Sequence, residues 1–367
     1  MKINHLLCIL LLLPGMIAPV LAAGDEFDVP RAMELVKRFE LKASAERPQW
    51  AERTDQPLFT VAWLSDSHIL DAESLAVNQA ACRLIREELH PCAVFVTGDN
   101  TAVSGGRIWE RYCRREECTG MGAAERTQYF FSQFLKAELP GFSCFVIPGD
   151  NWYQGFEKVF GPSVYAFSIC GYRFVFAAPD VTGRKNGCAL MEEDTVRWIA
   201  RQFDEYAASP VIYVQHEPLL PPSILRSGQI SALFSRHGNV VGVLSGHLHL
   251  DLSLSGGKWR QWCAPSLGRS HRPGFKLLLF YPDAIIGHSY EWQAAAGTFS
   301  RVEKYQHIVI PEKLRRGDEE SGRPAVAGYE AMPPRARRED LKLDEHYGDL
   351  IKELRLFAPR MLFINGE

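Results

Sequence analysis

The feature that constrains this chain most is a set of short apolar runs, each followed within three residues by an acidic residue or a histidine. The runs have the length and composition of buried β-strands, and they cover residues 58–64, 93–97, 143–147, 211–215 and 240–245. Segments with helical periodicity lie between or beside them, at residues 75–89, 124–139, 192–206 and 224–237. Cys170-Gly171 separates two further runs and indicates a hairpin. This alternation predicts an α/β fold with mixed sheets.

The residues that follow the five runs offer three carboxylates and four imidazoles. The carboxyl ends of strands are where open α/β sheets bind ligands, so the five loops can converge on one site. The seven side chains are Asp66, His68, Asp99, Asp150, His216, His247 and His249. This mixture suits a pair of metal ions such as Zn, Mn or Fe. In the Asp-x-His and His-x-His pairs, alternate residues of an extended segment point the same way, so both can face the site.

Each of these motifs alone has an ordinary explanation. A single histidine after a strand is more often hydrogen-bonded in the core or at the surface, and Gly-Asp is usually a turn. Five such motifs in succession, each at the end of a strand-like run, favour a metal site over turns. The glycine before Asp99, Asp150 and His247 is expected to let the backbone turn sharply as it leaves the strand.

The order of the motifs resembles the signature of calcineurin-like metallophosphoesterases, over residues 58–280. The motifs are Asp66-Ser-His68, Gly98-Asp99, Gly149-Asp150-Asn151, His216 and Gly246-His247-Leu-His249. The resemblance implies an α/β fold in which two mixed β-sheets pack as a sandwich flanked by helices. By analogy, Asp66, His68 and His249 hold one metal. His216, His247 and Asp150 hold the other, and Asp99 bridges both. Two metal ions about 3.5–4 Å apart can hold a bridging hydroxide that attacks phosphorus.

The sequence departs from the family at its third motif, where Gly149-Asp150-Asn151 stands in place of Gly-Asn-His. We favour Asp150 as the metal ligand; in the alternative register Asn151 is the ligand. Asn151 cannot act as the general acid, because an amide does not titrate. His271 is the substitute acid that we nominate, although a solvated loop explains it equally well. Asn100, next to Asp99, is expected to contact phosphate.

The balance of charge excludes one class of function. The chain has 41 Lys and Arg against 44 Asp and Glu, a net charge of -3, and therefore no overall cationic field for a nucleic-acid backbone. The expected partner is a phosphorylated small-molecule or macromolecular substrate, with no sequence-specific nucleic acid. No stable membrane span is expected after processing.

The N-terminus has the features of a secretory signal peptide. Lys2 precedes an apolar run, Leu6–Leu13, and small residues end the segment at Ala22-Ala23. A membrane anchor is the alternative, but prolines and a glycine interrupt the segment. We therefore expect a secreted or periplasmic protein. Without Cys8, eight of the nine cysteines remain, which permits disulfides in an exported chain. Cys113–Cys118 is the expected pair, and buried free thiols are the alternative.

We divide the chain into four segments: a signal peptide (1–23), an N-terminal arm (24–56), a metallophosphoesterase domain (57–292) and a charged C-terminal extension (293–367). Residues 340–356 of the extension could form an amphipathic helix. The predicted function is that of an exported metal-dependent phosphoesterase acting on phosphomonoester, phosphodiester or phosphoanhydride bonds. The alternative is a non-catalytic metal- and phosphate-binding protein that has lost its general acid.

Overall fold

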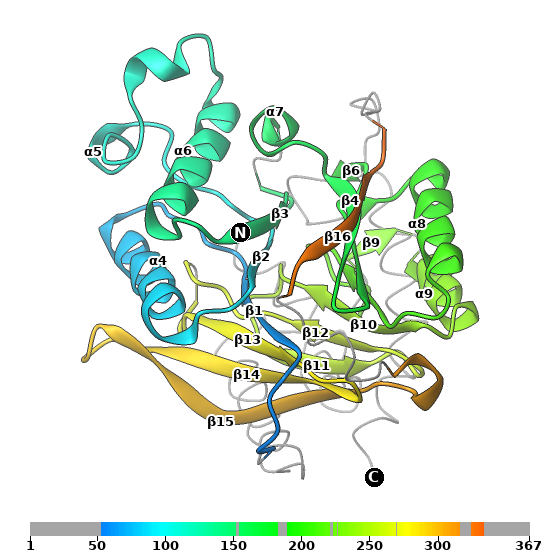
Figure 1. Cartoon of the computed structure of the whole chain (residues 1–367). Helices are drawn as coiled ribbons and strands as arrows, with labels where there is room; N and C mark the ends of the chain where they lie inside the picture. The colour runs from blue at the N-terminus through cyan, green and yellow to red at the C-terminus, as the bar shows by residue number, and fades with distance from the viewer. Residues whose placement is uncertain are drawn as a thin grey trace, which may run out of the picture.

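The structure, a computed structural model, describes residues 53–151, 154–182, 189–220, 223–225, 227–268, 270–315 and 324–333. The expected signal peptide, nearly all of the N-terminal arm and the expected C-terminal helix lie outside these ranges. Two β-sheets face each other and helices cover both outer faces (Figure 1). The predicted α/β sandwich of two mixed sheets is therefore confirmed. Among the described residues, no helix is long and apolar enough to cross a membrane.

The first sheet has six strands in the order β15-β14-β13-β1-β2-β3. Their bounds are β15 (Thr298–Val309), β14 (Ala284–Gln293), β13 (Gly274–Phe280), β1 (Phe59–Leu64), β2 (Ala93–Thr97) and β3 (Ser143–Ile147). β1, β2 and β3 run parallel, whereas β1 pairs with β13 in the antiparallel sense. The carboxyl ends of the three parallel strands therefore meet at one edge of the sheet.

The second sheet has seven strands in the order β11-β12-β10-β8-β5-β4-β16. Their bounds are β11 (Leu252–Ser255), β12 (Arg260–Cys263), β10 (Val240–Ser245), β8 (Val211–Val214), β5 (Tyr172–Ala177), β4 (Val164–Ile169) and β16 (Val326–Ala331). β12, β10, β8 and β5 are parallel neighbours. A small third sheet joins β6 (Val181–Thr182), β7 (Ala189–Leu190) and β9 (Ile224–Leu225).

The hairpin predicted at Cys170-Gly171 is confirmed, because β4 and β5 pair antiparallel around it. Both turn residues have positive φ, 45° and 76°, which a tight two-residue hairpin turn requires.

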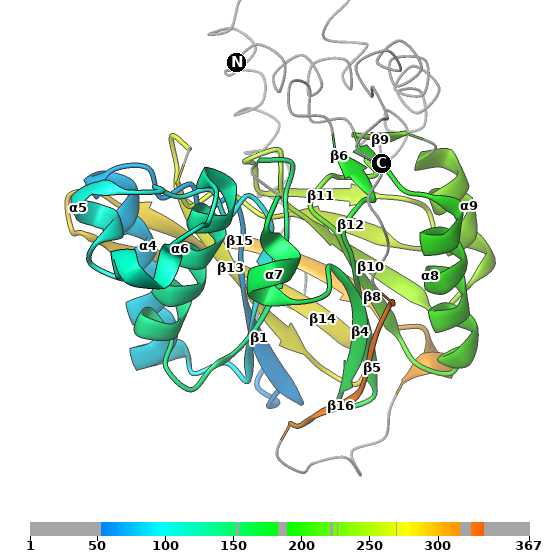
Figure 2. The ribbon, with the colours of Figure 1, turned by 90° about the horizontal axis from the view of Figure 1, so that it is seen from above.

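The helices lie in two groups on opposite sides of the sandwich (Figure 2). On the side of the six-stranded sheet are α4 (Ala72–Leu84) with its π-helical extension η2 (Ile85–Leu89), α5 (Gly106–Trp109), η3 (Arg115–Cys118) and α6 (Ala123–Glu138). On the other side are α8 (Glu193–Glu205) and α9 (Ser227–Arg236). Two short elements, α7 (Phe156–Phe160) and η4 (Glu312–Leu314), complete the described part. Asp71 caps α4 by accepting a hydrogen bond of 2.8 Å from the Ser74 backbone N–H.

Three hydrophobic cores follow from these layers. The core between the sheets is rich in aromatic rings, among them Trp63, Phe95, Phe174 and Trp262, all fully buried. The other two cores lie between each sheet and its helices. Alternate residues of a strand point to opposite faces, so β13 sends Leu278 to the middle core and Leu277 to the helix-covered core.

The sheets continue past residue 292, where the sequence analysis placed the end of the domain. β15 pairs along β14, and β16 pairs with β4 in the second sheet. The sequence analysis ended the strand-like pattern near residue 292, but the inward residues of β15 are apolar: Phe299 and Ile308 are buried in two different cores. Strand pairing and burial, rather than overall charge, determine which residues belong to the sandwich.

Cys113 and Cys118 are both buried. All of the described cysteines, including these two, have free thiols in the structure. Burial raises the pKa of Cys113 to about 12, and the neighbouring Cys118 adds to the shift. The two thiols are therefore near enough to interact electrostatically, but the expected disulfide stays a prediction. Cys188 lies outside the described residues.

Candidate metal centre

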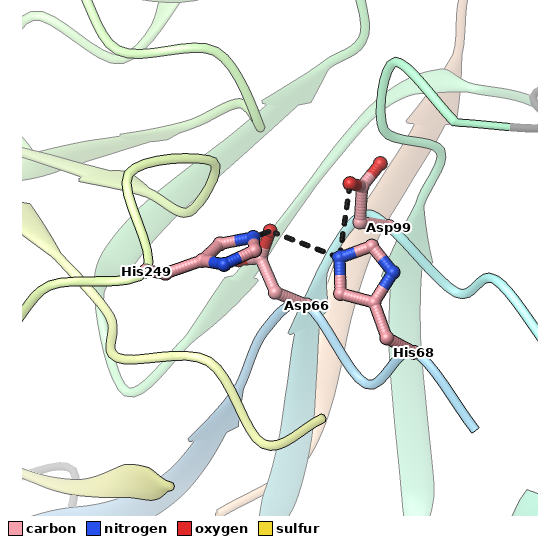
Figure 3. Close-up of side chains that lie close together, drawn as sticks. All are labelled: Asp66, His68, Asp99 and His249. Atoms are coloured by element: carbon pink, nitrogen blue, oxygen red, sulfur yellow. Dashed lines mark ion pairs between the residues drawn. The ribbon is translucent and has the colours of Figure 1, made fainter. Parts of the chain in front are cut away.

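The structure brings all seven predicted side chains together at the edge where the parallel strands of both sheets end. They form two groups, and within each group the nitrogen and oxygen atoms that could bind a metal lie within 4.8 Å of one another. Figure 3 shows the first group, which consists of Asp66, His68, Asp99 and His249. The second group consists of Asp150, His216 and His247.

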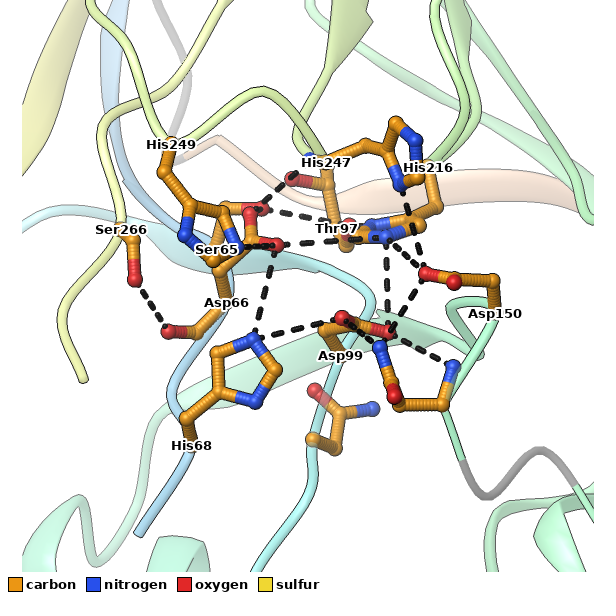
Figure 4. A network of polar contacts seen from close by, with 12 residues as sticks. Ser65, Asp66, His68, Thr97, Asp99, Asp150, His216, His247, His249 and Ser266 are labelled. Carbon is orange, nitrogen blue, oxygen red and sulfur yellow. Dashed lines mark hydrogen bonds and ion pairs between the residues drawn. The ribbon is translucent and has the colours of Figure 1, made fainter. Parts of the chain in front are cut away.

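Asp99 lies between the two groups (Figure 4). Its Oδ2 is 3.3 Å from His68 Nε2, and its Oδ1 is 3.4 Å from His216 Nε2. One carboxylate oxygen therefore faces each group, as a bridging ligand requires.

The remaining distances are similar. In the second group, Asp150 Oδ1 is 3.3 Å from both His216 Nε2 and His247 Nδ1. In the first, His249 Nε2 is 3.1 Å from Asp66 Oδ1. Nitrogen and oxygen atoms that face one another at these distances can share a cation.

Several polar atoms of the site are buried without a hydrogen-bond partner among the described residues. They are Asp66 Oδ1, both ring nitrogens of His68, and His216 Nε2. A buried polar atom left unpaired costs about 1–3 kcal/mol, so their presence at one point fits a site built for cations. The donor set, nitrogen and carboxylate oxygen without thiolate, fits Zn, Mn or Fe.

Surrounding groups hold two of the candidate ligands in place. The carbonyl of Thr97 lies 2.6 Å from His216 Nδ1 and places the ring proton there, which leaves the Nε2 lone pair facing the carboxylates. Ser65 Oγ donates to Asp66 Oδ2 at 2.5 Å, and Ser266 Oγ donates to the Asp66 backbone carbonyl at 2.9 Å.

The carboxylates and imidazoles perturb one another strongly. Burial opposes the charge on Asp66, yet the facing histidines, His249 foremost, hold its pKa below the usual range. Burial likewise acts to lower the pKa of His216, but Asp99 and Asp66 outweigh it and raise that pKa well above its usual value. Positive charge is therefore stabilised at this point, and a metal cation would replace the imidazolium protons.

The backbone is strained at most of the candidate ligands. Seven described non-glycine residues have positive φ, and five of them belong to the two groups: Asp66 (51°), His68 (37°), Asp99 (49°), His247 (69°) and His249 (58°). Such conformations persist only where the surrounding structure enforces them, and they cluster at functional sites.

The glycines before the candidate ligands have two different roles. Gly98, at φ +91°, turns the chain as predicted. Gly149 and Gly246 do not have a positive φ. A Cβ at Gly149 would collide with Asp99, and a Cβ at Gly246 would collide with the Ser65 side chain. The chain bends directly after both glycines, and the close approach of neighbouring loops is what requires a residue without a Cβ there.

Asn151 contacts the bridging carboxylate. Its backbone N–H donates to Asp99 Oδ1 at 2.9 Å, and its amide nitrogen is 2.6 Å from Asp99 Oδ2 and 3.3 Å from Asp150 Oδ1. Asp150 therefore points into the second group, and the Asn151 amide lies across both groups. This geometry favours Asp150 over Asn151 as the carboxylate partner of the two histidines.

The other predicted residues differ in where they lie. Asn100 is fully buried beside Asp99; its amide donates to the Ile147 carbonyl at 3.2 Å, and its Oδ1 has no hydrogen-bond partner among the described residues. His271 is exposed on the loop between β12 and β13, and it belongs to neither group.

The sequence analysis missed Glu217. This carboxyl group is fully buried and neither oxygen has a hydrogen-bond partner among the described residues. Burial, reinforced by the charge of Asp150, raises the pKa of Glu217 to about 7. Its only signal in the sequence is its position directly after His216.

Comparisons with known proteins agree with this fold. No family model and no curated protein matches the sequence. Among solved structures, a dimetal phosphatase from Danio rerio is similar at a TM-score of 0.55, with 13% identity, over 70% of this chain and 100% of that chain. GAP50, described as the anchor in the inner membrane complex of Plasmodium, is similar at a TM-score of 0.50, with 12% identity, over 72% of this chain and 92% of that chain.

At these identities the likeness shows the fold. The chain has the calcineurin-like metallophosphoesterase fold that its motifs imply, with two groups of candidate ligands that support a pair of metal ions.

Proposed function

We propose that this protein is a metal-dependent phosphoesterase that hydrolyses phosphomonoester, phosphodiester or phosphoanhydride bonds. The observation that carries the proposal is the pair of ligand groups that share Asp99. Buried polar atoms of Asp66, His68 and His216 in these groups have no hydrogen-bond partner among the described residues. The likeness in fold to a dimetal phosphatase supports it.

Two bound metal ions would supply the nucleophilic hydroxide and neutralise the phosphoryl oxygens. The protein's own residues would fix the geometry. Asp99 sets the distance between the two groups, and the Thr97 carbonyl orients the ring of His216. Asn100 and Asn151 add amide groups beside Asp99, which can donate hydrogen bonds to a phosphoryl oxygen.

No described side chain of the two groups is free to protonate the leaving group. Asn151 stands where the family has a histidine, and His271 is exposed on a separate loop. We therefore propose that the enzyme acts best on esters whose leaving group departs without a proton, such as aryl esters and phosphoanhydrides.

The second candidate is a non-catalytic protein that binds metal and phosphate. Asn151 is the observation that favours it, because removal of a general acid is one way in which turnover is lost. The likeness to GAP50, described as an anchor, is consistent with this reading of the fold.

Export is part of the proposal. The sequence features of residues 1–23 support a secreted or periplasmic protein. N-terminal sequencing of the protein recovered from the cells that make it tests this, because cleavage near Ala22 or Ala23 is expected.

Metal analysis of the purified protein, combined with a panel of phosphomonoesters, phosphodiesters and phosphoanhydrides, tests the function. We expect two metal ions per chain and loss of turnover on chelation. Two bound metals without turnover on any substrate would favour the non-catalytic candidate. Absence of metal, with no activity restored by Mn, Zn or Fe, would contradict both.

A further inference from the structure

A buried ion pair lies beside the loop that carries His247 and His249. The ammonium group of Lys276, on β13, is 2.6 Å from Asp251 Oδ1, and the Lys276 side chain is completely buried. Asp251 follows His249 by two residues. Lysine is almost never fully buried unless it is paired, so Lys276 depends on Asp251, which lies two residues after the candidate ligand His249.

The pair is the centre of a network that joins the two sheets. The Asp251 carboxylate accepts hydrogen bonds from Lys276, from Ser289 Oγ and, at 2.9 Å, from Gln306 Nε2. Lys276 also donates to Ser289 Oγ at 2.8 Å. The three partners come from β13, β14 and β15 of the six-stranded sheet, whereas Asp251 lies in the connection from β10 to β11 of the other sheet. The network therefore fixes this connection against the opposite sheet.

The loop between His247 and Asp251 needs such an anchor. Its two histidines have φ of 69° and 58°, which is unfavourable for residues other than glycine. The His249 side chain is also 24% exposed, whereas the ring of His216 is completely buried. Complete burial and the Thr97 carbonyl hold the ring of His216, whereas the partly exposed ring of His249 depends more on the backbone that carries it.

We infer that the Asp251–Lys276 pair is a positioning device for His249: it holds the strained loop so that His249 Nε2 faces Asp66 and completes the first ligand group. Neither residue belongs to the ligand groups. The inference rests on the part of the proposed function that gives each group a metal ion, and it does not depend on turnover.

Titration of the purified full chain with Co²⁺, followed by visible absorption, tests the inference. Lys276→Met removes the cation and keeps a side chain of similar length. We expect one of the two Co²⁺-binding events to weaken about 10–100-fold, as when a group that orients a ligand is lost. The second event should weaken less, since His216 and Asp150 are held by other loops and only His247 shares the loop with His249.

Arg173→Met is the matched control. Arg173 is also completely buried, on β5, and its guanidinium donates to Gln202 at 2.5 Å and to the Gly328 carbonyl at 2.7 Å. This variant also loses a buried cation, but it should keep both Co²⁺ affinities. If Lys276→Met does not fold, Gln306→Ala removes one hydrogen bond to Asp251 and keeps the ion pair. It should weaken the same event roughly 3–10-fold, the equivalent of one hydrogen bond.

Wild-type Co²⁺ affinities in Lys276→Met or Gln306→Ala would overturn the inference. It would also be overturned if Lys276→Met and Arg173→Met both weakened the two Co²⁺-binding events to the same extent. The proposed function fails differently: wild-type protein would bind two Co²⁺ ions and hydrolyse no phosphoester.

Discussion

The two ligand groups differ in burial. The second group is enclosed: His216 is completely buried, and the side chains of His247 and Asp150 are each 5% exposed. It has Asp150 where the family has an amide, and the buried carboxyl of Glu217 lies next to His216. The first group is more open, because the side chain of His249 is 24% exposed. Electrostatic attraction is stronger where water is excluded, so we expect the second group to hold its metal more tightly and the first to exchange more readily.

The largest expected effect comes from removing what the two groups share. Asp99→Asn weakens both metals at once, and we expect turnover to fall roughly 10³-fold, at the upper end of the effect of losing one electrostatic contact in an active site. Steady-state kinetics and metal content measured on the same preparation check this. Loss of one metal only, with the other bound normally, would show that Asp99 belongs to a single group.

The next effect concerns Asn151, which lies across both groups. General acid catalysis is typically worth 10²–10⁴-fold, so the wild-type rate should fall steeply as the leaving-group pKa of the ester rises. Asn151→His should raise the rate on alkyl phosphates about 10²-fold. A series of phosphoesters with graded leaving groups, run on wild type, Asn151→His and His271→Ala, decides the matter.

Two outcomes of that series would change the interpretation. A flat dependence in wild type that becomes steep in His271→Ala would identify His271 as the acid. A flat dependence in all three proteins would show that another group protonates the leaving oxygen.

A smaller effect separates the two groups directly. Asp150→Asn removes one negative charge from the second group and restores the amide of the family pattern. We expect affinity for the second metal to fall about 10-fold, the low end of effects on metal affinity, while the first metal is unaffected. Competition with a chelator, monitored for each metal in turn, measures both affinities. A weakened first metal would contradict the separation of the groups.

The last prediction concerns a loop outside both groups, where no effect on the metals is expected. If Cys113 and Cys118 form a disulfide in the exported protein, reduction should lower the free energy of unfolding by about 2 kcal/mol, because the closed loop is short. Neither metal affinity should change. Intact mass with and without reductant detects the bond, and free thiols in protein from its native compartment would exclude it.

The convergence of the seven candidate ligands could be predicted from the sequence, because the carboxyl ends of parallel strands necessarily meet at one edge. The pattern of apolar runs predicted the bounds of β1, β2 and β3 almost to the residue. Their roles as ligands stay a prediction. Pattern could not reveal that Asp99 directs one oxygen to each group, because that depends on the side-chain geometry of a residue with φ of 49°.

Other features depend on contacts between distant parts of the chain. Nothing local marks Lys276 as the partner of Asp251, or β16 as a neighbour of β4. Glu217 is similar, since one acidic residue after a histidine is usually solvated, and only the packed structure shows it to be buried. The strand-like pattern was misleading at residue 292 because the buried residues of β15 lie in two different cores.

The central position of β1 has a consequence for folding. Its partner β13 begins more than 200 residues later in the chain, and the edge strand β16 pairs with β4 after an interval of more than 150 residues. Bringing such distant segments together costs loop-closure entropy before any contact repays it. Neither sheet can be completed until most of the polypeptide is present, although β1, β2 and β3 and the β4–β5 hairpin can pair earlier. If the protein is exported as we propose, late completion of the sheets is compatible with transport across a membrane before folding.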